Sequence, residues 1–297
     1  MSAGRENEAG KAAAPAEPLL REIETTAVEL ARLAGAAIVG ALGRTLAVRY
    51  KDLPEAVAAF RDPVSEVDQA VEVLLRARLA ERFPEHDVIG EEMDERPGRD
   101  HDFVWVVDPI DGTTNFVNGF PMFACSIGVL WRGLPVVGAL WCSTSHALRS
   151  GVYHARHGGM LQFDEEPLEA RRNAAVRRGL AGEPYAGGGD LPWDTRQTGS
   201  AAIEGAFVAA GLLRATWFNR PNIWDVGGAV PLVRAAGGEV RASTGPGGWA
   251  PLERFEPQAA VEGGQPDLRH WRRALVLGEP EAVALLCRHL GETHPAE

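Results

Sequence analysis

The spacing of apolar and polar positions predicts that helices and strands alternate along the chain. Apolar residues recur at helical spacing over residues 19–42 and 66–82, and Pro84 ends the second predicted helix. Short apolar runs at residues 87–90 and 103–107 predict two strands, and acidic residues follow each strand. Both strands therefore deliver carboxylates at their ends.

The second half of the chain continues this alternation. Residues 123–131 and 134–141 flank Arg132-Gly133, a pair typical of a hairpin turn, and residues 147–153 predict a third antiparallel strand. Pro231 is expected to kink the helix that contains it, because it lacks a backbone donor. The later part predicts a helix, a strand, a helix closed by Gly237-Gly238, a strand and a helix, at residues 200–214, 215–218, 225–236, 274–277 and 280–290. The pattern predicts an α/β fold of layered helices and sheets.

The length of 297 residues allows one large domain or two modest ones. Residues 1–18 are polar, alanine-rich and punctuated by proline, which predicts a disordered tail. We expect residues 19–297 to form a single domain, with an N-terminal half at 19–165 and a C-terminal α/β half at 196–297. Residues 170–196 are rich in glycine, proline and arginine, and they predict an irregular connection.

Charge and composition narrow the possible functions. The net charge of −11 argues against a nucleic-acid partner, because phosphate backbones select basic surfaces. The three cysteines, Cys125, Cys142 and Cys287, are scattered, which favours a cytoplasmic protein without disulfides. The most apolar stretch, residues 27–48, contains charged residues and predicts a buried helix, so we expect no membrane partner.

Acidic residues stand at the ends of several separate predicted elements: Asp68, Glu91, Asp108, Asp111 and Asp225. Carboxylates at strand ends can converge, and a cluster of oxygen donors without histidine or cysteine suits Mg²⁺ rather than zinc. Like charges raise one another's pKa values unless a cation lies between them. Two ions that share a carboxylate would hold the attacking and leaving oxygens of a phosphoryl transfer.

The residues after Asp111 add a feature of phosphate sites. Gly112 and Thr113 would present backbone N–H groups at a helix N-terminus, which suits a phosphate. Taken singly, each acid also has an ordinary structural role. Asp68 and Asp225 sit where helix caps belong, and Asp-Pro and Asp-Gly are turn dipeptides. The metal and phosphate hypothesis therefore requires that these residues lie together in space.

Four motifs occur in order between residues 62 and 238. They are Asp62-Pro-Val-Ser-Glu-Val-Asp68, Gly90-Glu91-Glu92, Trp105-Val-Val-Asp108-Pro-Ile-Asp111-Gly-Thr113-Thr-Asn-Phe116, and Ile223-Trp-Asp225-Val-Gly-Gly followed by Ala235-Ala-Gly-Gly238. With these motifs the chain resembles the inositol monophosphatase family of Mg²⁺-dependent, lithium-sensitive phosphatases. The resemblance covers nearly everything except the N-terminal tail. It implies an αβαβα sandwich and a homodimer.

The resemblance also implies a set of metal ligands. Glu91, Asp108 and the carbonyl of Ile110 would ligate a first Mg²⁺ ion. Asp108, Asp111 and Asp225 would ligate a second, and Glu91 would help to hold a weaker third. The predicted cofactor is therefore Mg²⁺, as two or three ions, held mainly by the N-terminal half of the chain.

Catalytic and substrate-binding roles follow from the same resemblance. Thr113, oriented by Asp68, would help to activate a metal-bound water, with Glu91 as part of the same machinery. The glycine-x-alanine segment at Gly199 to Ala201 would turn its backbone toward the substrate. The phosphate and substrate contacts implied are Gly112, Thr113, Asp111, Gly199 and Ala201.

One departure concerns the substrate. In inositol-specific members of the family, a glutamate that binds ring hydroxyls lies seven residues before the aspartate matched by Asp225. In this chain that position is Phe218, with Asn219 beside it. Phe218 is either a pocket residue or part of the core. The resemblance therefore implies phosphatase chemistry and leaves inositol specificity open.

These observations predict a phosphomonoesterase that acts on a small phosphorylated metabolite, with inositol monophosphate as the first candidate. Histidinol phosphate, fructose 1,6-bisphosphate and adenosine 3′,5′-bisphosphate are alternative substrates. Haloacid-dehalogenase-type chemistry is disfavoured, because it uses Asp-x-Asp and this chain has Asp-x-x-Asp. A non-catalytic regulatory relative is also disfavoured, because a retired site has no reason to keep mutually repelling carboxylates. Residues 170–196 are either a solvated loop or a contact for a second substrate phosphate.

Overall fold

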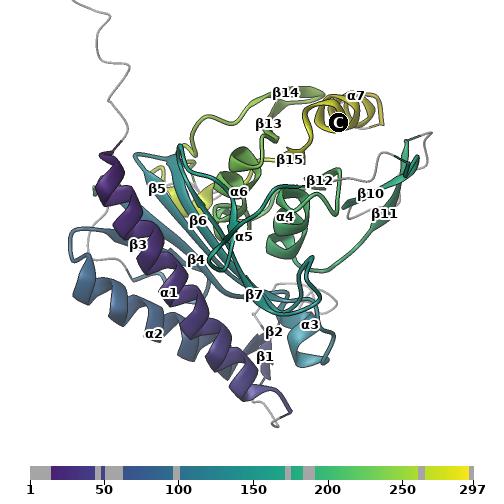
Figure 1. The fold of residues 1–297 in the computed structure, drawn as a ribbon. Helices are drawn as coiled ribbons and strands as arrows, with labels where there is room; N and C mark the ends of the chain where they lie inside the picture. Colours follow the sequence, from purple (N-terminus) through teal and green to yellow (C-terminus); the bar gives the residue numbers. More distant parts are fainter. Residues whose placement is uncertain are drawn as a thin grey trace, which may run out of the picture.

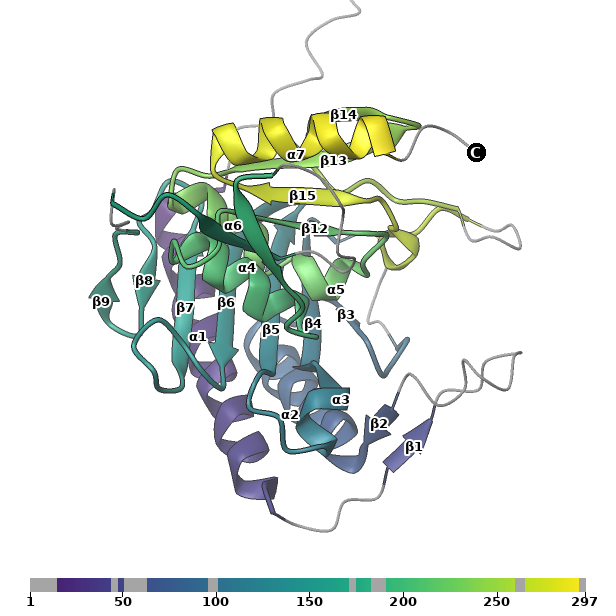
Figure 2. The same cartoon turned by 90° about the vertical axis from the view of Figure 1, so that its right-hand side faces the viewer.

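The structure is a computed structural model that describes residues 15–43, 48–50, 63–95, 101–170, 175–182, 191–259 and 265–293. Its elements form alternating layers: helices, a large sheet, helices, a smaller sheet and a last helix (Figures 1 and 2). Three hydrophobic clusters fill the spaces between these layers. The predicted α/β layered sandwich is confirmed.

The large sheet carries the apolar strand that leads to the predicted site. Trp105 and Val107 pack into the cluster under the outer helices, whereas Val104 and Val106 pack into the cluster on the opposite face. This alternation buries both faces, which explains why the strand is apolar throughout. The strand order is β3 (Asp87–Gly90), β4 (Phe103–Asp111), β5 (Ala124–Trp131), β6 (Leu134–Cys142), β7 (Gly151–Arg156), β8 (Gln162–Phe163) and β9 (Glu166–Pro167).

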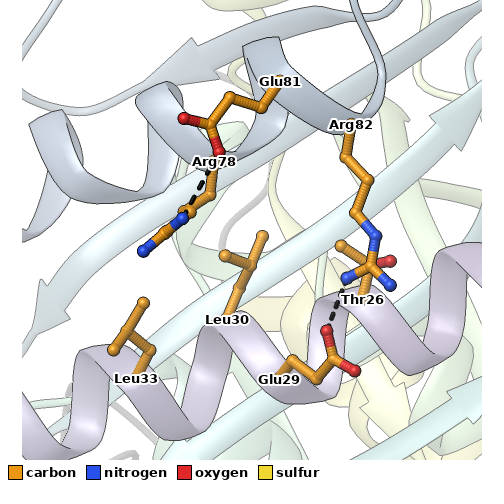
Figure 3. Close-up of a pocket in the computed structure, with 7 residues that line it drawn as sticks. All are labelled: Thr26, Glu29, Leu30, Leu33, Arg78, Glu81 and Arg82. Carbon is orange, nitrogen blue, oxygen red and sulfur yellow. Dashed lines mark hydrogen bonds and ion pairs between the residues drawn. The ribbon is translucent and has the colours of Figure 1, made fainter.

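Two long helices, α1 (Glu17–Ala41) and α2 (Glu66–Arg82), cover one face of this sheet (Figure 1). A groove of about 310 Å³ lies between them, and the Glu29–Arg82 ion pair spans it at 2.5 Å (Figure 3). The groove includes Arg78, which is ten residues along α2 from Asp68. At the helical rise this separation is about 15 Å, so the groove is remote from the predicted site.

The other face of the large sheet is covered by α4 (Ala201–Ala209), α5 (Ile223–Val226) and α6 (Ala229–Ala235). Beyond these helices lies the second sheet, whose outer face is covered by α7 (Pro280–Thr293) (Figure 2). Its strand order is β11 (Trp193–Arg196), β10 (Gly179–Gly182), β12 (Ala215–Phe218), β15 (Leu275–Gly278), β13 (Glu239–Gly245) and β14 (Gly248–Pro251). The remaining described elements are β1 (Val48–Tyr50), β2 (Pro63–Ser65), α3 (Thr113–Val117) and the 3₁₀ helix η1 (Leu268–His270).

Glycines allow the junction of α5 and α6 to approach the sheet closely. A Cβ atom added to Gly128 on β5 would overlap the backbone of Gly227, and one added to Gly138 on β6 would overlap the carbonyl of Gly228. Ser126 Oγ also donates to the carbonyl of Trp224 at 2.9 Å. These contacts fix the helical turn that carries Asp225 against the large sheet.

Many predicted elements match the structure. The helix at 66–82 and the strands at 87–90 and 215–218 are confirmed at their predicted bounds. All three cysteines are free and buried, as the absence of a disulfide framework predicted. No described helix is both long enough and apolar enough to cross a membrane. Residues 1–14, most of the predicted tail, lie outside the described residues.

Several predicted bounds are wrong for identifiable reasons. The strand predicted at 147–153 begins only at Gly151, because a turn precedes it in which Leu148 has a φ of 54°. The helix predicted at 200–214 ends at Ala209, and Gly211 follows with a φ of 76°. The helix predicted at 225–236 is divided at Gly227-Gly228.

The interruption of this helix falls where Pro231 would disrupt it. Gly227 is the fourth residue before Pro231, and a proline ring clashes with the carbonyl at that position in a continuous helix. Pro231 is instead the third residue of α6, where its missing donor costs no hydrogen bond because the first four N–H groups of a helix have no intrahelical acceptor.

We predict that Gly138→Ala destabilises the protein by about 1–3 kcal/mol, because the new methyl group overlaps the Gly228 carbonyl and forces the α5–α6 junction away from β6. Gly40→Ala is the matched control, because nothing lies near its added Cβ on the exposed side of α1. Chemical denaturation of both variants measures the difference. Equal stabilities would show that the junction tolerates displacement.

Candidate active site

The β4 strand ends at two of the predicted ligands, Asp108 and Asp111. In a regular strand, side chains three residues apart point to opposite faces. The pairing of β4 with β5 shifts register between these two aspartates, which marks a bulge. Both side chains are buried, and the charge of Asp111 acts on the carboxyl of Asp108. The bulge therefore brings the two carboxylates into one group.

Glu91 reaches the same group from the neighbouring strand. β3 runs parallel to β4, with Gly90 opposite Val107, so the two strands end at the same edge of the sheet. The N–H of Glu91 donates to the carbonyl of Val107 at 3.2 Å. The Glu91 charge is the largest charge effect on Asp108.

A fully buried glutamate on α2 holds the turn after β3. The Glu72 carboxylate accepts from the N–H of Glu92 at 2.8 Å, from the N–H of Met93 at 3.2 Å, and from Arg76 Nε at 2.7 Å. A Cβ atom at Gly90 would overlap the Glu72 carboxylate, so only glycine fits there. Glu72 was not among the predicted site residues. An acid between Val71 and Leu75, on the apolar face of the helix, could have indicated a buried structural role.

A cation holds the same turn from its other side. Arg269 on η1 donates to the carbonyl of Gly90, and its second nitrogen donates to the carbonyl of Glu91 at 3.2 Å. The guanidinium also lies over the ring of Trp224, 5.0 Å from its centroid. Because Trp224 directly precedes Asp225, Arg269 connects the Glu91 turn to α5. Nothing in the sequence around Arg269 predicted this contact.

Asp68 and Thr113 meet at the start of α2. Ser65 caps this helix, and Asp68 Oδ2 accepts from the Ser65 N–H at 2.9 Å. The other carboxylate oxygen, Oδ1, lies 3.1 Å from Thr113 Oγ1, which is also 2.8 Å from the carbonyl of Ile110. The structure thus brings together Asp68, Thr113 and Ile110. Asp62, at the start of the first motif, lies outside the described residues.

Asp111 is held by the first residues of α4. Its Oδ2 accepts from Ser200 Oγ and from the N–H of Ala202, both at 2.5 Å. The N–H of Ala201 bonds to the same carboxyl. Gly199, with a φ of 75°, turns the chain into this helix. The predicted residues Gly199 and Ala201 therefore lie beside Asp111, and Ser200 is a further site residue that its helix-cap position could have signalled.

Asp225 is the third residue of α5 and forms a capping box with Asn222. Its Oδ2 accepts from the N–H of Asn222 at 2.8 Å and from the Asn222 side chain at 3.1 Å. The charges of Asp111 and Glu91 act on the Asp225 carboxyl. Glu91, Asp108, Asp111 and Asp225 therefore share one electrostatic environment.

Burial is the main reason why the acids of this group are hard to ionise. It raises the pKa of Asp108 well above its ordinary value, and the charges of Glu91 and Asp111 raise it further. Burial and neighbouring carboxylates likewise raise the pKa of Asp225. The pKa of Asp111 rises to about 7, although the hydrogen bonds from Ser200 and Ala202 oppose the rise. Burial also raises the pKa of Asp68.

The donor set of this group suits a hard cation. Asp108 Oδ1 is buried and has no hydrogen-bond partner among the described residues, which leaves one oxygen without a counterpart. Its neighbours are carboxylates, the ligands that Mg²⁺ prefers. As the side chains lie, no three described His, Cys, Asp or Glu residues are grouped to hold one ion. Asp111 and Asp225 instead accept hydrogen bonds from the protein.

Two further predicted features have different outcomes. Gly112 has a φ of 88° and begins the turn into α3, so its backbone geometry requires glycine. Phe218 is half-buried and packs against the core between the two sheets. Within the arginine-rich segment, Arg178 pairs with Asp194 at 2.5 Å, and residues 171–174 and 183–190 lie outside the described residues.

Comparison with known proteins defines the family. The profile of the inositol monophosphatase family matches residues 19–266, which is most of the chain, and the protein belongs to this family. The chain is 30% identical over 236 residues to the chloroplastic phosphatase IMPL1 of Arabidopsis thaliana, a match that covers 73% of the chain and 62% of the plant protein. Members of this family are generally metal-dependent phosphatases.

Other relatives carry a different name. The chain is 32% identical over 244 residues to the Nus factor SuhB of Salmonella typhimurium, covering 74% of the chain and 85% of that protein. The crystal structure of the extragenic suppressor protein suhB from Bartonella henselae superposes with a TM-score of 0.68 at 26% identity, over 91% of this chain and 98% of that one. Family membership alone therefore leaves the substrate undefined.

We predict that Glu72→Gln weakens Mg²⁺ binding by about tenfold or more, because the amide cannot accept from Arg76 and from two backbone N–H groups as the carboxylate does. Isothermal titration of the chelator-treated protein with Mg²⁺ measures the effect. Glu81→Gln is the control, because Glu81 is an exposed acid near the other end of α2. Unchanged affinity in Glu72→Gln would mean that the Glu91 turn keeps its shape without this support.

We also predict that Asp225→Asn raises the Tm of the chelator-treated protein by at least about 2 °C at pH 8. The folded pKa of Asp225 is raised, so ionisation destabilises the folded state as the pH rises above 3.8, the ordinary value. The gain in Tm should therefore be largest at high pH. It should vanish below pH 3.8, where Asp225 is protonated in both the folded and the unfolded protein. Thermal melts at several pH values test this dependence, and a gain that grew toward low pH would contradict it.

Proposed function

We propose that this protein is a Mg²⁺-dependent phosphomonoesterase that hydrolyses a small polyol or sugar phosphate, such as inositol monophosphate. The observation that carries the proposal is that the charges of Glu91, Asp111 and Asp225 act on the carboxyl of Asp108, whose Oδ1 is buried without a partner among the described residues. Membership of the inositol monophosphatase family supports the same chemistry.

The acid group would hold two or three Mg²⁺ ions. Glu91, Asp108 and the Ile110 carbonyl would bind one ion, and Asp108, Asp111 and Asp225 would bind another. When bound, Mg²⁺ supplies positive charge that acidifies water and stabilises the leaving oxygen. Asp111 and Asp225 would exchange hydrogen bonds with Ser200 and Asn222 for a place in the ligand set.

Thr113 and Asp68 would handle the proton of the attacking water. The Thr113 hydroxyl can donate to Asp68 Oδ1, which leaves its oxygen free to accept from a water molecule. Burial raises the pKa of Asp68, so its carboxylate is a better proton acceptor than an ordinary aspartate. The N–H groups of Gly112 and Thr113 would bind the phosphate, and Gly199 and Ala201 would contact the rest of the substrate.

The substrate preference follows from what replaces the family's hydroxyl-binding glutamate. Phe218 packs against the core, and its ring has no polar atom with which to hydrogen-bond a polyol. A site without that carboxylate discriminates weakly among hydroxylated leaving groups. We therefore propose a substrate range broader than inositol monophosphate. A homodimer and a cytoplasmic location remain predictions. The absence of a nucleic-acid partner also remains a prediction, and it must be tested because some relatives carry the name Nus factor.

We predict that hydrolysis of inositol 1-phosphate requires Mg²⁺, is inhibited by lithium and stops in excess chelator. Asp111→Asn should lower kcat by at least about a hundredfold, because it removes charge that holds an ion against the leaving oxygen. Asp194→Asn, an exposed aspartate on β11, is the matched control. Full activity in chelator, or more than about a tenth of wild-type kcat in Asp111→Asn, would contradict the assignment.

A further inference from the structure

A cationic cavity of about 610 Å³ opens beside the acid group, between the ends of β12, β13 and the segment that leads into β15. None of the described residues that line it is acidic. Its polar lining consists of three arginines and three neutral side chains: Arg220, Arg272, Arg273, Asn219, Ser243 and Thr244. We name it the arginine cavity.

Arg220 is the least satisfied of the three cations. It is exposed, and its φ of 56° places its backbone in the left-handed region, directly after the exposed Asn219 at the end of β12. Among the described residues, its guanidinium makes no hydrogen bond and no ion pair. A left-handed φ at a residue other than glycine stores some backbone strain, and functional positions are among the places where such strain is found.

The other two arginines are fixed in the wall by backbone carbonyls. Arg273 Nε donates to the carbonyl of Ser243 at 2.7 Å, and Arg272 Nη1 donates to the carbonyl of Trp271 at 2.8 Å. Burial lowers the pKa of Arg272, the charge of Asp225 opposes this effect, and the charges of Arg269 and Arg220 add to it. Among the described residues, neither Arg220 nor Arg273 pairs with a carboxylate, so a bound anion would stabilise the positive charges of these two side chains.

The position of the arginine cavity connects it to the acid group. The Arg272 guanidinium lies over the ring of Trp224, 5.4 Å from its centroid, and Trp224 directly precedes Asp225. The charges of Asp225 and Glu91 both act on Arg272. A ligand whose phosphate is held at the acid group would therefore extend toward the three arginines.

We propose that the arginine cavity binds a second anionic group of the substrate, a phosphate or carboxylate on the part that leaves. This inference rests on the proposed phosphatase function, and it specifies the substrate class as phosphomonoesters that carry a second anionic group. Guanidinium groups bind both anions through paired N–H donors. In inositol-specific relatives, the position matched by Phe218 would carry a carboxylate that binds hydroxyl groups. In this chain the nearest charged side chain in that segment is Arg220, two residues later.

The test uses ligands that cannot be hydrolysed, so binding is measured apart from catalysis. Alkane bisphosphonates of increasing chain length, and alkyl monophosphonates of the same lengths, are titrated into the Mg²⁺-loaded protein by calorimetry. We expect at least one bisphosphonate to bind about tenfold or more tightly than its monophosphonate, which corresponds to about 1.4 kcal/mol. Equal affinities across the series would overturn the proposal.

Variants of the arginines test whether the tighter binding of bisphosphonates depends on the arginine cavity. Arg220→Gln should reduce the ratio of the two dissociation constants to near one, and Arg273→Gln should reduce it in part. Arg178→Gln is the control, because this exposed arginine on the same sheet already pairs with Asp194. A ratio that survives Arg220→Gln and Arg273→Gln together, in protein with wild-type circular dichroism, would also overturn the proposal.

Turnover measurements separate this inference from the proposed function. We expect kcat/KM for fructose 1,6-bisphosphate or 3-phosphoglycerate to exceed that for glycerol 2-phosphate, with the difference mainly in KM. The second anionic group is a phosphate in fructose 1,6-bisphosphate and a carboxylate in 3-phosphoglycerate, so the two substrates show which group the arginine cavity prefers. Tighter bisphosphonate binding without any turnover would support the anion site and contradict the phosphatase function. Turnover without tighter bisphosphonate binding would support the phosphatase function and contradict the anion site.

Discussion

The concentration of buried carboxylates where β4 ends is the constraint on which the rest of the structure depends. Burial and mutual repulsion raise the pKa values of Asp108, Asp111 and Asp225, so folding must offset a local cost. The chain does this with donors that each come from a helix start: Ser200 and Ala202 for Asp111, and Asn222 for Asp225. Asp108 Oδ1 is buried without a partner among the described residues. A cation in the middle of the group would satisfy that atom and reverse the sign of the repulsion.

Support for this group comes from segments that are distant in sequence. Glu72 on α2 and Arg269 on η1 hold the same turn from opposite sides, through backbone groups on either side of Glu91. Glycine contacts between α6 and the large sheet hold Asp225 in place. The large sheet is thus coupled to the site, because it carries Asp108 and Asp111 and contacts the turn that holds Asp225.

Features that depend on local sequence were predictable. Apolar spacing and Pro84 defined α2, and an apolar run defined residues 103–107 of β4. Among the motif residues, Thr113 contacts Asp68, and the charges of Glu91 and Asp111 act on Asp108. Pairings that depend on tertiary structure were not predictable: Arg269 lies 178 residues from the Glu91 carbonyl to which it donates, and no periodicity encodes that contact. The β13–β14 hairpin was also missed, although Val240 and Ala242 are buried in alternation with half-buried polar residues in β13.

The net charge of the chain affects how an anionic substrate could be captured. A chain with a net charge of −11 repels anions over most of its surface, so an anionic substrate needs a local region of opposite sign to be captured. The arginine cavity supplies such a region, and its Arg272 guanidinium lies over the ring of Trp224, which directly precedes Asp225. A glutamate at this edge would select hydroxyl groups by accepting their hydrogen bonds. With Phe218 half-buried against the core and Arg220 exposed, this edge of the site would instead select charge under our proposal, which links the loss of one expected contact to the gain of another.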